Sequence, residues 1–313
     1  MSVQSSRTFS ETGKMKQIKS SFFHADNSGD EKHELKADNI LTNETVIEPR
    51  KTAKRFWKEL WAYRELFYFL AWKDILVRYK QTAIGITWSV IRPLLTMLIF
   101  TVIFGEIAKL PSGDVPYPIL VYAAMLPWQF FSNTLAESSN SIISNVNMIS
   151  KIYFPRIIIP TTSMVVSLID FMISSMILGG LMVWYGFYPD EKVLILPLLL
   201  ILAILTSLGA GYLIAALNVR YRDFRIIVPF IVQIGLYLSP VGFSSNVVPE
   251  KWRLLYSLNP MVGVIDGFRW ALLGETTQIY WTGFWISVGL ALALFIIGTR
   301  FFLRMERSFA DVI

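Results

Sequence analysis

Apolar residues gather in six long runs that are separated by short polar connections. A helix needs about 20 mainly apolar residues to cross the hydrocarbon of a membrane, and each run approaches or exceeds that length. The runs are continuous rather than alternating, which favours helices over the strands of a membrane barrel. They occupy residues 84–106, 117–135, 157–187, 193–217, 226–248 and 280–303. The pattern therefore predicts an all-α polytopic membrane protein with six transmembrane helices.

Lysine and arginine are distributed unevenly among the connections. They concentrate before the first run, in the second and fourth connections and after the last run, whereas the other three connections are close to charge balance. Because basic segments resist translocation, we predict that both termini and the basic connections are cytoplasmic and that the other connections face outward. The net charge of +6 then reflects membrane orientation, and it gives no reason to expect a nucleic-acid partner.

The part of the chain before the first run divides into two segments. Residues 1–50 are polar and charged, with too few apolar positions to bury a core, so we expect a mostly flexible tail. In residues 51–80 apolar positions recur three and four apart beside basic ones. This spacing predicts an amphipathic helix lying among the lipid headgroups, although a packing helix of a soluble domain remains an alternative. Residues 81–313 then form the six-span domain.

The fifth run contains signals that interrupt a helix. Only residues 226–238 precede Ser239 and Pro240, and this stretch is too short to cross a membrane. Asn259 followed by Pro260 is a helix start, with an N-cap side chain before a proline at the first helical position. We predict a broken crossing followed by short re-entrant helices on the outer side, before the last span.

Two ionisable residues, Arg92 and Asp170, lie inside predicted spans. An intramembrane charge is a candidate for function, for example in a proton relay. A relay needs a chain of such groups, and these spans offer one carboxylate and no histidine. We therefore favour a structural or interhelical pair, and Arg92 can also extend its charged end to the cytoplasmic headgroups.

Several classes of chemistry are excluded by composition. The chain has no cysteine, and both histidines, His24 and His33, lie in the polar tail. Disulfides, thiol catalysis and histidine or thiolate metal sites are therefore not expected in the membrane part. The phosphate-binding pattern G-x-x-x-x-G-K-[ST] does not occur. We predict no catalytic residue, no metal and no cofactor in this chain, and any ATP would be hydrolysed by a partner.

Five segments resemble, in order, the permease subunit of type-2 ABC exporters for O-antigen, capsule and teichoic-acid polysaccharides. They are LAWKDILVRYKQTAIGITWSVIRPLLTMLIFTVIFG at 70–105, LPWQFFSNTLAESSNSIISNVNMISKIYFPRIIIP at 126–160, ALNVRYRDFRIIVPF at 216–230, LNPMVGVIDGFRWALLG at 258–274 and RMERSFADVI at 304–313. The likeness covers residues 46–313.

The resemblance implies a set of partners and a cargo. Two copies of the permease would assemble with two ATPase subunits that bind ATP and Mg. The complex would move an undecaprenyl-linked polysaccharide, with O-antigen as the expected cargo, outward across the bacterial inner membrane. A membrane-embedded glycosyltransferase or ligase of surface polysaccharide assembly is the alternative, but it would be expected to place acids, histidine or a metal at a membrane face. A non-transporting scaffold would not need the broken helix.

The resemblance also suggests functional positions. Within the second connection, residues 137–156, apolar positions at helical spacing predict a short amphipathic helix, with an ordinary solvated loop as the alternative. Residues 145–156 of this connection and residues 220–225 match the family's contacts with the ATPase, although 220–225 could serve only as a basic anchor, and residues 240–274 match its outer gate. The candidate docking residues are Asn145, Met148, Ile149, Lys151, Tyr153, Arg156, Arg220, Arg222 and Asp223. The candidate gate residues are Pro240, Asn259, Pro260 and Arg269.

A pathway for polysaccharide has its own chemical requirement. Sugar rings have apolar faces, so a conduit along which they slide should offer aromatic side chains without strong fixed charges. The candidates on predicted spans are Trp88, Phe100, Phe104, Trp128, Phe131, Phe230 and Tyr237. Packing between helices or a place in the interfacial aromatic belt is the alternative for each of them.

Overall fold

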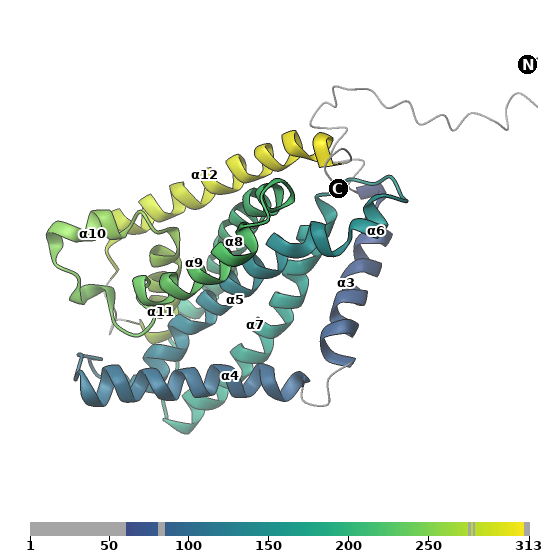
Figure 1. Ribbon diagram of the computed structural model, residues 1–313. Helices are drawn as coiled ribbons and strands as arrows, with labels where there is room; N and C mark the ends of the chain where they lie inside the picture. Colours follow the sequence, from purple (N-terminus) through teal and green to yellow (C-terminus); the bar gives the residue numbers. More distant parts are fainter. Residues whose placement is uncertain (1–60, 81–84, 275–276, 278, 310–313) are drawn as a thin grey trace, which may run out of the picture. The chain divides into compact units, whose positions relative to one another are not determined.

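The computed structural model describes residues 61–80, 85–274, 277 and 279–309, all within the contact unit Ala53–Ile313. The tail predicted for residues 1–50 and the start of the helix predicted for 51–80 lie outside the described residues. Throughout the described ranges the regular structure is helical and contains no strand (Figure 1). The prediction of an all-α protein is therefore confirmed.

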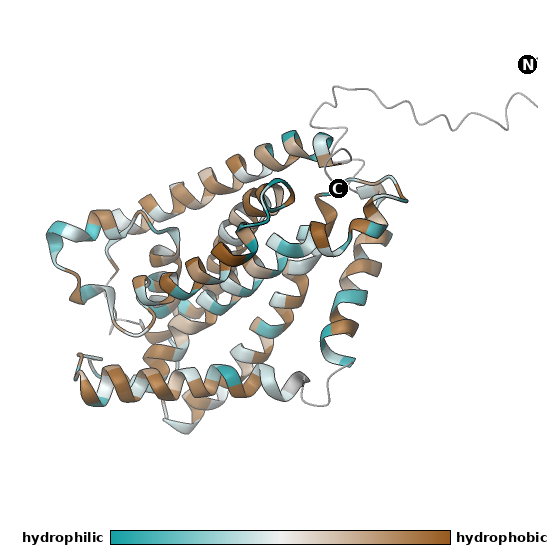
Figure 2. Ribbon diagram, in the orientation of Figure 1, coloured by the Kyte–Doolittle hydropathy of each residue, from teal (hydrophilic) through white to brown (hydrophobic). Residues whose placement is uncertain are grey.

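The long helices follow the apolar runs closely. In chain order the main elements are α3 (Arg64–Lys80), α4 (Gly85–Phe100) with a π-helical extension η1 (Thr101–Ile107), α5 (Tyr117–Ser144), α6 (Val146–Ile149), α7 (Ile158–Trp184), α8 (Leu196–Arg220) preceded by the 3₁₀ turn η2 (Glu191–Ile195), α9 (Phe224–Leu238), η3 (Ser245–Val247), α10 (Glu250–Tyr256), α11 (Pro260–Leu273) and α12 (Trp281–Met305) followed by η5 (Glu306–Ser308). Figure 2 shows α4 and α12 coloured mostly as hydrophobic, with hydrophilic residues gathered around connections such as that of α10.

Among the described residues, four helices are both long and apolar enough to cross a membrane. They are α4 with its extension, α7, α8 with its preceding turn, and α12. Helix α9 is apolar but spans only 15 residues, and it ends just before Ser239 and Pro240, as the sequence predicts. Helix α5 is long, but it carries many polar residues toward its end. A multi-pass membrane protein is thus supported, and the count of six crossings stays a prediction.

Helix α5 lies at the centre of the bundle, in contact with α4, α7, α8, α9 and α11. Its first half is buried, and Ile119, Val121 and Ala123 have no exposed surface. It continues to Ser144, beyond the predicted end at residue 135. Ser138 donates to the carbonyl of Pro160 at 2.9 Å, so this polar stretch remains inside the protein. The amphipathic helix predicted in the second connection is therefore mainly the end of α5, and α6 is a single turn.

Helices α8 and α12 approach each other closely because both carry glycine at the crossing. A Cβ built on Gly298 would collide with the backbone carbonyl of Gly209, and a Cβ on Gly209 would lie 2.6 Å from the backbone nitrogen of Phe295. Small residues at such crossings bring the two backbones into direct van der Waals contact, which is the main attraction between helices in lipid.

The break after α9 and the start of α11 occur where the sequence predicts them. Helix α9 ends at Leu238, and Asn259 caps α11 by accepting from the backbone nitrogen of Met261 at 3.0 Å. The amide of Asn259 also donates to the Ser239 hydroxyl at 3.0 Å, which ties the cap to the break. Gly274 ends α11 with φ +66°, a conformation that favours glycine. Helix α11 is largely buried beside α5, α8 and α12.

Arg269 holds the irregular segment after α9 in place. Its side chain is 1% exposed, and it donates to the backbone carbonyls of Leu120 at 3.1 Å, Val241 at 2.9 Å and Phe243 at 2.6 Å. The carbonyls of Val241 and Phe243 belong to the broken stretch, where no helix supplies them with a donor, and the carbonyl of Leu120 lies at the start of α5, so one guanidinium joins the broken stretch to α5. Irregular backbone at membrane depth requires such internal partners.

We predict that Arg269→Ala strongly destabilises the protein. Three hydrogen bonds from a charged donor disappear, and a hydrogen bond to a charged group contributes about 1.5–3 kcal/mol, so the loss should exceed about 3 kcal/mol. The measurement is thermal unfolding of the purified protein in lipid nanodiscs, with the exposed Lys251→Ala as the matched loss of a cation. Equal melting temperatures for the two variants would contradict this role of Arg269.

Candidate functional site

A polar cavity lies among α4, α5, α7 and α9, beside the end of α3. Its volume is about 590 Å³. Polar and charged side chains make up much of its wall: Arg78, Ser89, Arg92, Thr96, Gln129, Ser132, Asn133, Glu137, Asp170, Ser174 and Gln233. Apolar residues such as Trp88 and Trp128 complete it. A polar hollow between membrane-length apolar helices can hold water or a polar ligand, whereas lipid chains could not satisfy its walls.

The wall is formed by stripes of residues at helical spacing. Helix α5 contributes Gln129, Ser132 and Asn133, and α4 contributes Ser89 and Thr96. Side chains three and four residues apart share one face of a helix, so each helix turns one mixed face toward the cavity. The sequence carried this signal as polar residues recurring inside two apolar runs, and our sequence analysis did not use it.

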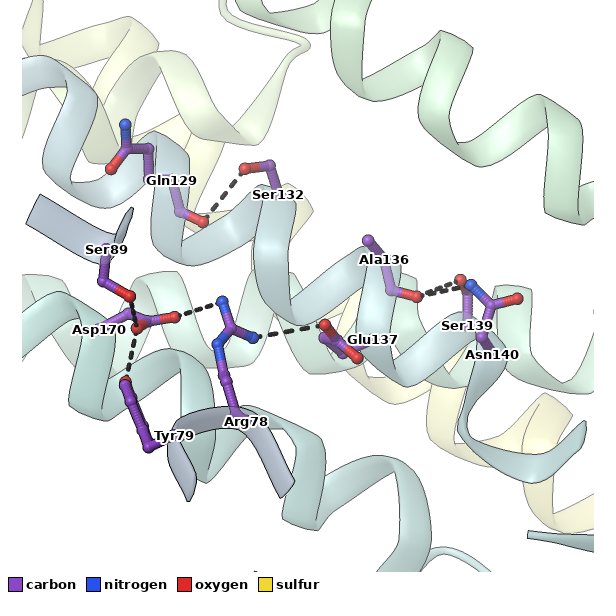
Figure 3. Close-up of polar contacts among 10 residues, drawn as sticks. All are labelled: Arg78, Tyr79, Ser89, Gln129, Ser132, Ala136, Glu137, Ser139, Asn140 and Asp170. Atoms are coloured by element: carbon purple, nitrogen blue, oxygen red, sulfur yellow. Dashed lines mark hydrogen bonds and ion pairs between the residues drawn. The ribbon is translucent and has the colours of Figure 1, made fainter. Parts of the chain in front are cut away.

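Asp170 is held by three neighbours at the edge of the cavity (Figure 3). Arg78 forms an ion pair with it at 2.6 Å. The hydroxyls of Tyr79 and Ser89 donate to its other oxygen at 2.7 and 3.1 Å. Asp170 is only 8% exposed as a whole residue, and its carboxylate needs such partners because a buried charge without them is strongly unfavourable. The prediction of an interhelical pair for Asp170 is confirmed, and its partners come from α3 and α4.

Burial raises the pKa of the Tyr79 phenol well above its usual value, and its hydrogen bond to Asp170 acts in the same direction. The phenol therefore stays protonated at any physiological pH and can always donate to the carboxylate. This contact fastens the end of α3 to the middle of α7, along which α3 packs.

Arg78 also reaches a second carboxylate. Its other amine lies 3.4 Å from Glu137 on α5, so one guanidinium stands between two acids, as Figure 3 shows. The two contacts differ in character, since the Asp170 side chain is 11% exposed and that of Glu137 is 57% exposed.

Arg92 lies apart from this cluster. It is exposed on α4, lines the cavity and, among the described residues, forms no ion pair within 4.0 Å. Extension of its charged end to the headgroups therefore stays a prediction.

The seven aromatic candidates fall into separate groups. Trp88 and Trp128 line the cavity, and Phe131 packs on Trp128 with ring centroids 5.5 Å apart. Phe100 is buried, with its ring 5.4 Å from that of Phe104 and 6.3 Å from that of Tyr237.

Phe230 and Tyr237 are both exposed on α9. Only Trp88 and Trp128 therefore belong to the cavity wall, and a pathway role for the seven stays a hypothesis.

The four outer-gate candidates lie close together. Pro240 is buried between Ser239 and Val241, which contact Asn259 and Arg269 respectively. Pro260 follows the Asn259 cap as the first residue of α11. The hydrogen bonds of Arg269 to backbone carbonyls hold the segment after α9 against α5 and α11, so these four residues form a fixed contact and not an open passage.

Four of the nine docking candidates line a second hollow, of about 450 Å³, at the α6 end of the molecule. Lys151, Tyr153 and Arg156 line it together with Ile149 and Phe309. Ile149 is only 7% exposed and packs inward, whereas the neighbouring Tyr153 is 59% exposed. Tyr153 and its exposed neighbour Ile152, which the sequence analysis did not select, therefore present the accessible apolar surface.

Arg156 is fixed to the end of α12. Its backbone nitrogen donates to the Glu306 carboxylate at 2.7 Å, and its guanidinium donates to the Glu306 carbonyl at 2.8 Å. Met148 is partly buried against an apolar cluster that includes Ile149 and Phe309. Asn145 accepts from Lys73 of α3 at 3.1 Å.

The second set of docking candidates is exposed at the turn between α8 and α9. It consists of Arg220, Arg222 and Asp223. Asn218, just before them, donates to the carbonyl of Ser139 on α5 at 2.8 Å, so this turn lies near the same end of α5 as α6.

Over the described ranges, no three histidine, aspartate or glutamate side chains gather as a metal site.

Comparison with known proteins gives one family match. Residues 65–273 match the model of the ABC-2 type transporter family. An O-antigen export system permease protein of Myxococcus xanthus is 28% identical over 218 residues, which cover 69% of this chain and 83% of that protein. A protein of the same name from Klebsiella pneumoniae is 26% identical over 77% of this chain and 92% of that protein. A polysialic acid transport protein of Escherichia coli is 23% identical over 64% of this chain and 78% of that protein.

The family match encloses α3 to α11, and with them the polar cavity, the Asp170 cluster and the broken helix. It spans more than half of the 313 residues. These helices and their buried polar contacts are therefore those of a membrane transport protein, and the chain belongs to the ABC-2 type transporter family.

Proposed function

We propose that this chain is the permease subunit of an ABC exporter that moves a lipid-linked polysaccharide, O-antigen, across the bacterial inner membrane. The observation that carries the proposal is the polar cavity of about 590 Å³ enclosed by α4, α5, α7 and α9. Its hydroxyl and amide side chains suit the hydroxyl groups of a sugar chain, and Trp88 and Trp128 offer faces for stacking. The names of the relatives support the choice of cargo.

The energy source is assigned to partners. The chain has no phosphate-binding loop, so two ATPase subunits with bound ATP and Mg would supply the work, and a second copy of this permease would complete the complex. The exposed surface formed by Ile152, Tyr153 and the turn 220–223 is the proposed ATPase contact. Lys151, Arg156 and Arg220 lie at this end, which supports a cytoplasmic location for it and for both termini.

We predict that filling the cavity blocks export without stopping ATP hydrolysis. In Ser132→Trp, an indole occupies space where the sugar chain would pass, whereas Gly180→Trp adds a similar bulk where nothing lies within 4 Å of the new Cβ. Surface O-polysaccharide, measured on cells lacking the natural gene, should fall at least about tenfold for Ser132→Trp, as expected if the indole raises the barrier to passage by about 1.4 kcal/mol or more. Gly180→Trp should export normally.

ATPase activity of the purified complex distinguishes a blocked pathway from a misfolded protein. Retained hydrolysis with lost export supports the pathway, whereas normal export by Ser132→Trp would contradict the proposed function of the cavity.

We predict that Tyr153→Asp weakens binding of the ATPase subunit. The side chain is 59% exposed, so the change should leave the permease folded while placing a charge in an apolar contact. Tyr188→Asp, at a residue 73% exposed in the connection between α7 and α8, is the matched control. Co-purification of the ATPase with tagged permease should drop for Tyr153→Asp alone. Equal recovery with both variants would exclude Tyr153 from the interface.

A further inference from the structure

A third hollow, which is polar and distinct from the one at α6, adjoins the polar cavity and shares part of its wall. This interfacial groove, of about 540 Å³, lies between α3, α5 and α7 and is lined by Lys73, Asp74, Ser141, Ser144, Asn145 and Ser163, among others. Arg78 and Glu137 line both the groove and the polar cavity. The groove lies at the end of the molecule that carries α6, since Asn145 directly precedes that turn. The contact between Arg78 and Glu137 thus stands where the two hollows meet.

Arg78 is held more firmly in this contact than Glu137 is. Arg78 is anchored on Asp170 at 2.6 Å, and Tyr79 and Ser89 hold the same carboxylate. The contact with Glu137 is longer, at 3.4 Å, and its carboxylate is mostly exposed to solvent. Exposed ion pairs are weak, so Glu137 can leave while Arg78 stays.

Other basic side chains are also found in the walls of the two hollows. Lys73 lines the groove, Arg78 lines both hollows and Arg92 lines the cavity. An oxyanion that entered the groove would meet the Arg78 amine that Glu137 now occupies. Guanidinium binds phosphate as readily as carboxylate, and often through two parallel hydrogen bonds.

We propose that the Arg78–Glu137 contact is a gate between the interfacial groove and the polar cavity, opened when a phosphate group of the lipid carrier replaces Glu137 on Arg78. This assignment rests on the proposed function, because that function supplies a phosphate-bearing lipid. It gives the interfacial helix α3 a specific task, which is to present Arg78 to the headgroup of the cargo. No bond is made or broken in this exchange of ion-pair partners.

The gate can be tested by thiol labelling, because the chain contains no cysteine. Ser144→Cys places a thiol in the groove, and Ser132→Cys places one in the cavity. Inside-out membrane vesicles holding the complete transporter are treated with a membrane-impermeant anionic methanethiosulfonate. The groove thiol should react quickly and the cavity thiol slowly.

Adding Glu137→Gln should raise the labelling rate of the Ser132→Cys thiol about fivefold, which is the largest effect expected from the loss of a partly exposed ion pair. The labelling rate of the Ser144→Cys thiol should not change. Glu250→Gln, an exposed acid on α10, is the matched control and should change neither rate. An unchanged rate at Ser132→Cys in the Glu137→Gln protein would overturn the gate.

Farnesyl diphosphate tests the ligand. It should protect the Ser144→Cys thiol, whereas farnesol, which lacks the phosphates, should not. Arg78→Lys keeps a cation for Asp170 but lacks a second amine, so it should remove the protection. Protection by farnesol, or protection that survives Arg78→Lys, would exclude the phosphate site. Equal protection by inorganic pyrophosphate would exclude a lipid source. Because labelling does not depend on export, these failures would leave the proposed function standing.

Discussion

Every polar group inside the hydrocarbon must find its partner within the protein, and the described structure is organised around this requirement. Arg269 donates to two carbonyls of the non-helical chain between α9 and α11 and to the Leu120 carbonyl at the start of α5. Asp170 is balanced by Arg78, Tyr79 and Ser89, which joins α3, α4 and α7. Each of these contacts connects segments that lie far apart in the sequence. The apolar surfaces allow many arrangements of the helices, whereas the buried polar contacts select one of them.

The same requirement explains why the cavity indicates function. A bundle with no task would be expected to fill its interior with apolar side chains, whereas α4, α5 and α9 turn serine, threonine, glutamine and asparagine toward a shared space. Thr96 and Ser132 donate to carbonyls of their own helices at 2.9 and 3.1 Å, and their hydroxyl oxygens can still accept hydrogen bonds from water or sugar hydroxyls. Arg78, Glu137 and Asp170 line this space where α3 meets the bundle. Selection of the cargo and its passage would therefore use different parts of one wall.

The sequence predicted features that depend on neighbouring residues and missed those that depend on distant ones. The cap at Asn259 and the break after Leu238 are local signals, and the structure contains both. The extension of α5 to Ser144 was missed because its polar end packs inside the protein, where Ser138 donates to the carbonyl of Pro160 and Ser139 accepts from Asn218. Asp170 was expected to pair between helices, but its partner Arg78 lies on α3, far away in the sequence, and could not be identified by spacing. The polar stripes on α4 and α5 were visible in the sequence, but the space that they share depends on how the helices pack together.

The central claim is that the polar cavity is the path of the cargo. The most direct measurement is an electron cryomicroscopy structure of the complete transporter, arrested with a hydrolysis-deficient ATPase and bound to its lipid-linked polysaccharide. The account predicts glycan density beside Gln129, Ser132 and Trp128, with the carrier phosphate near Arg78. Glycan density along another surface, with this cavity empty or filled by lipid, would contradict it.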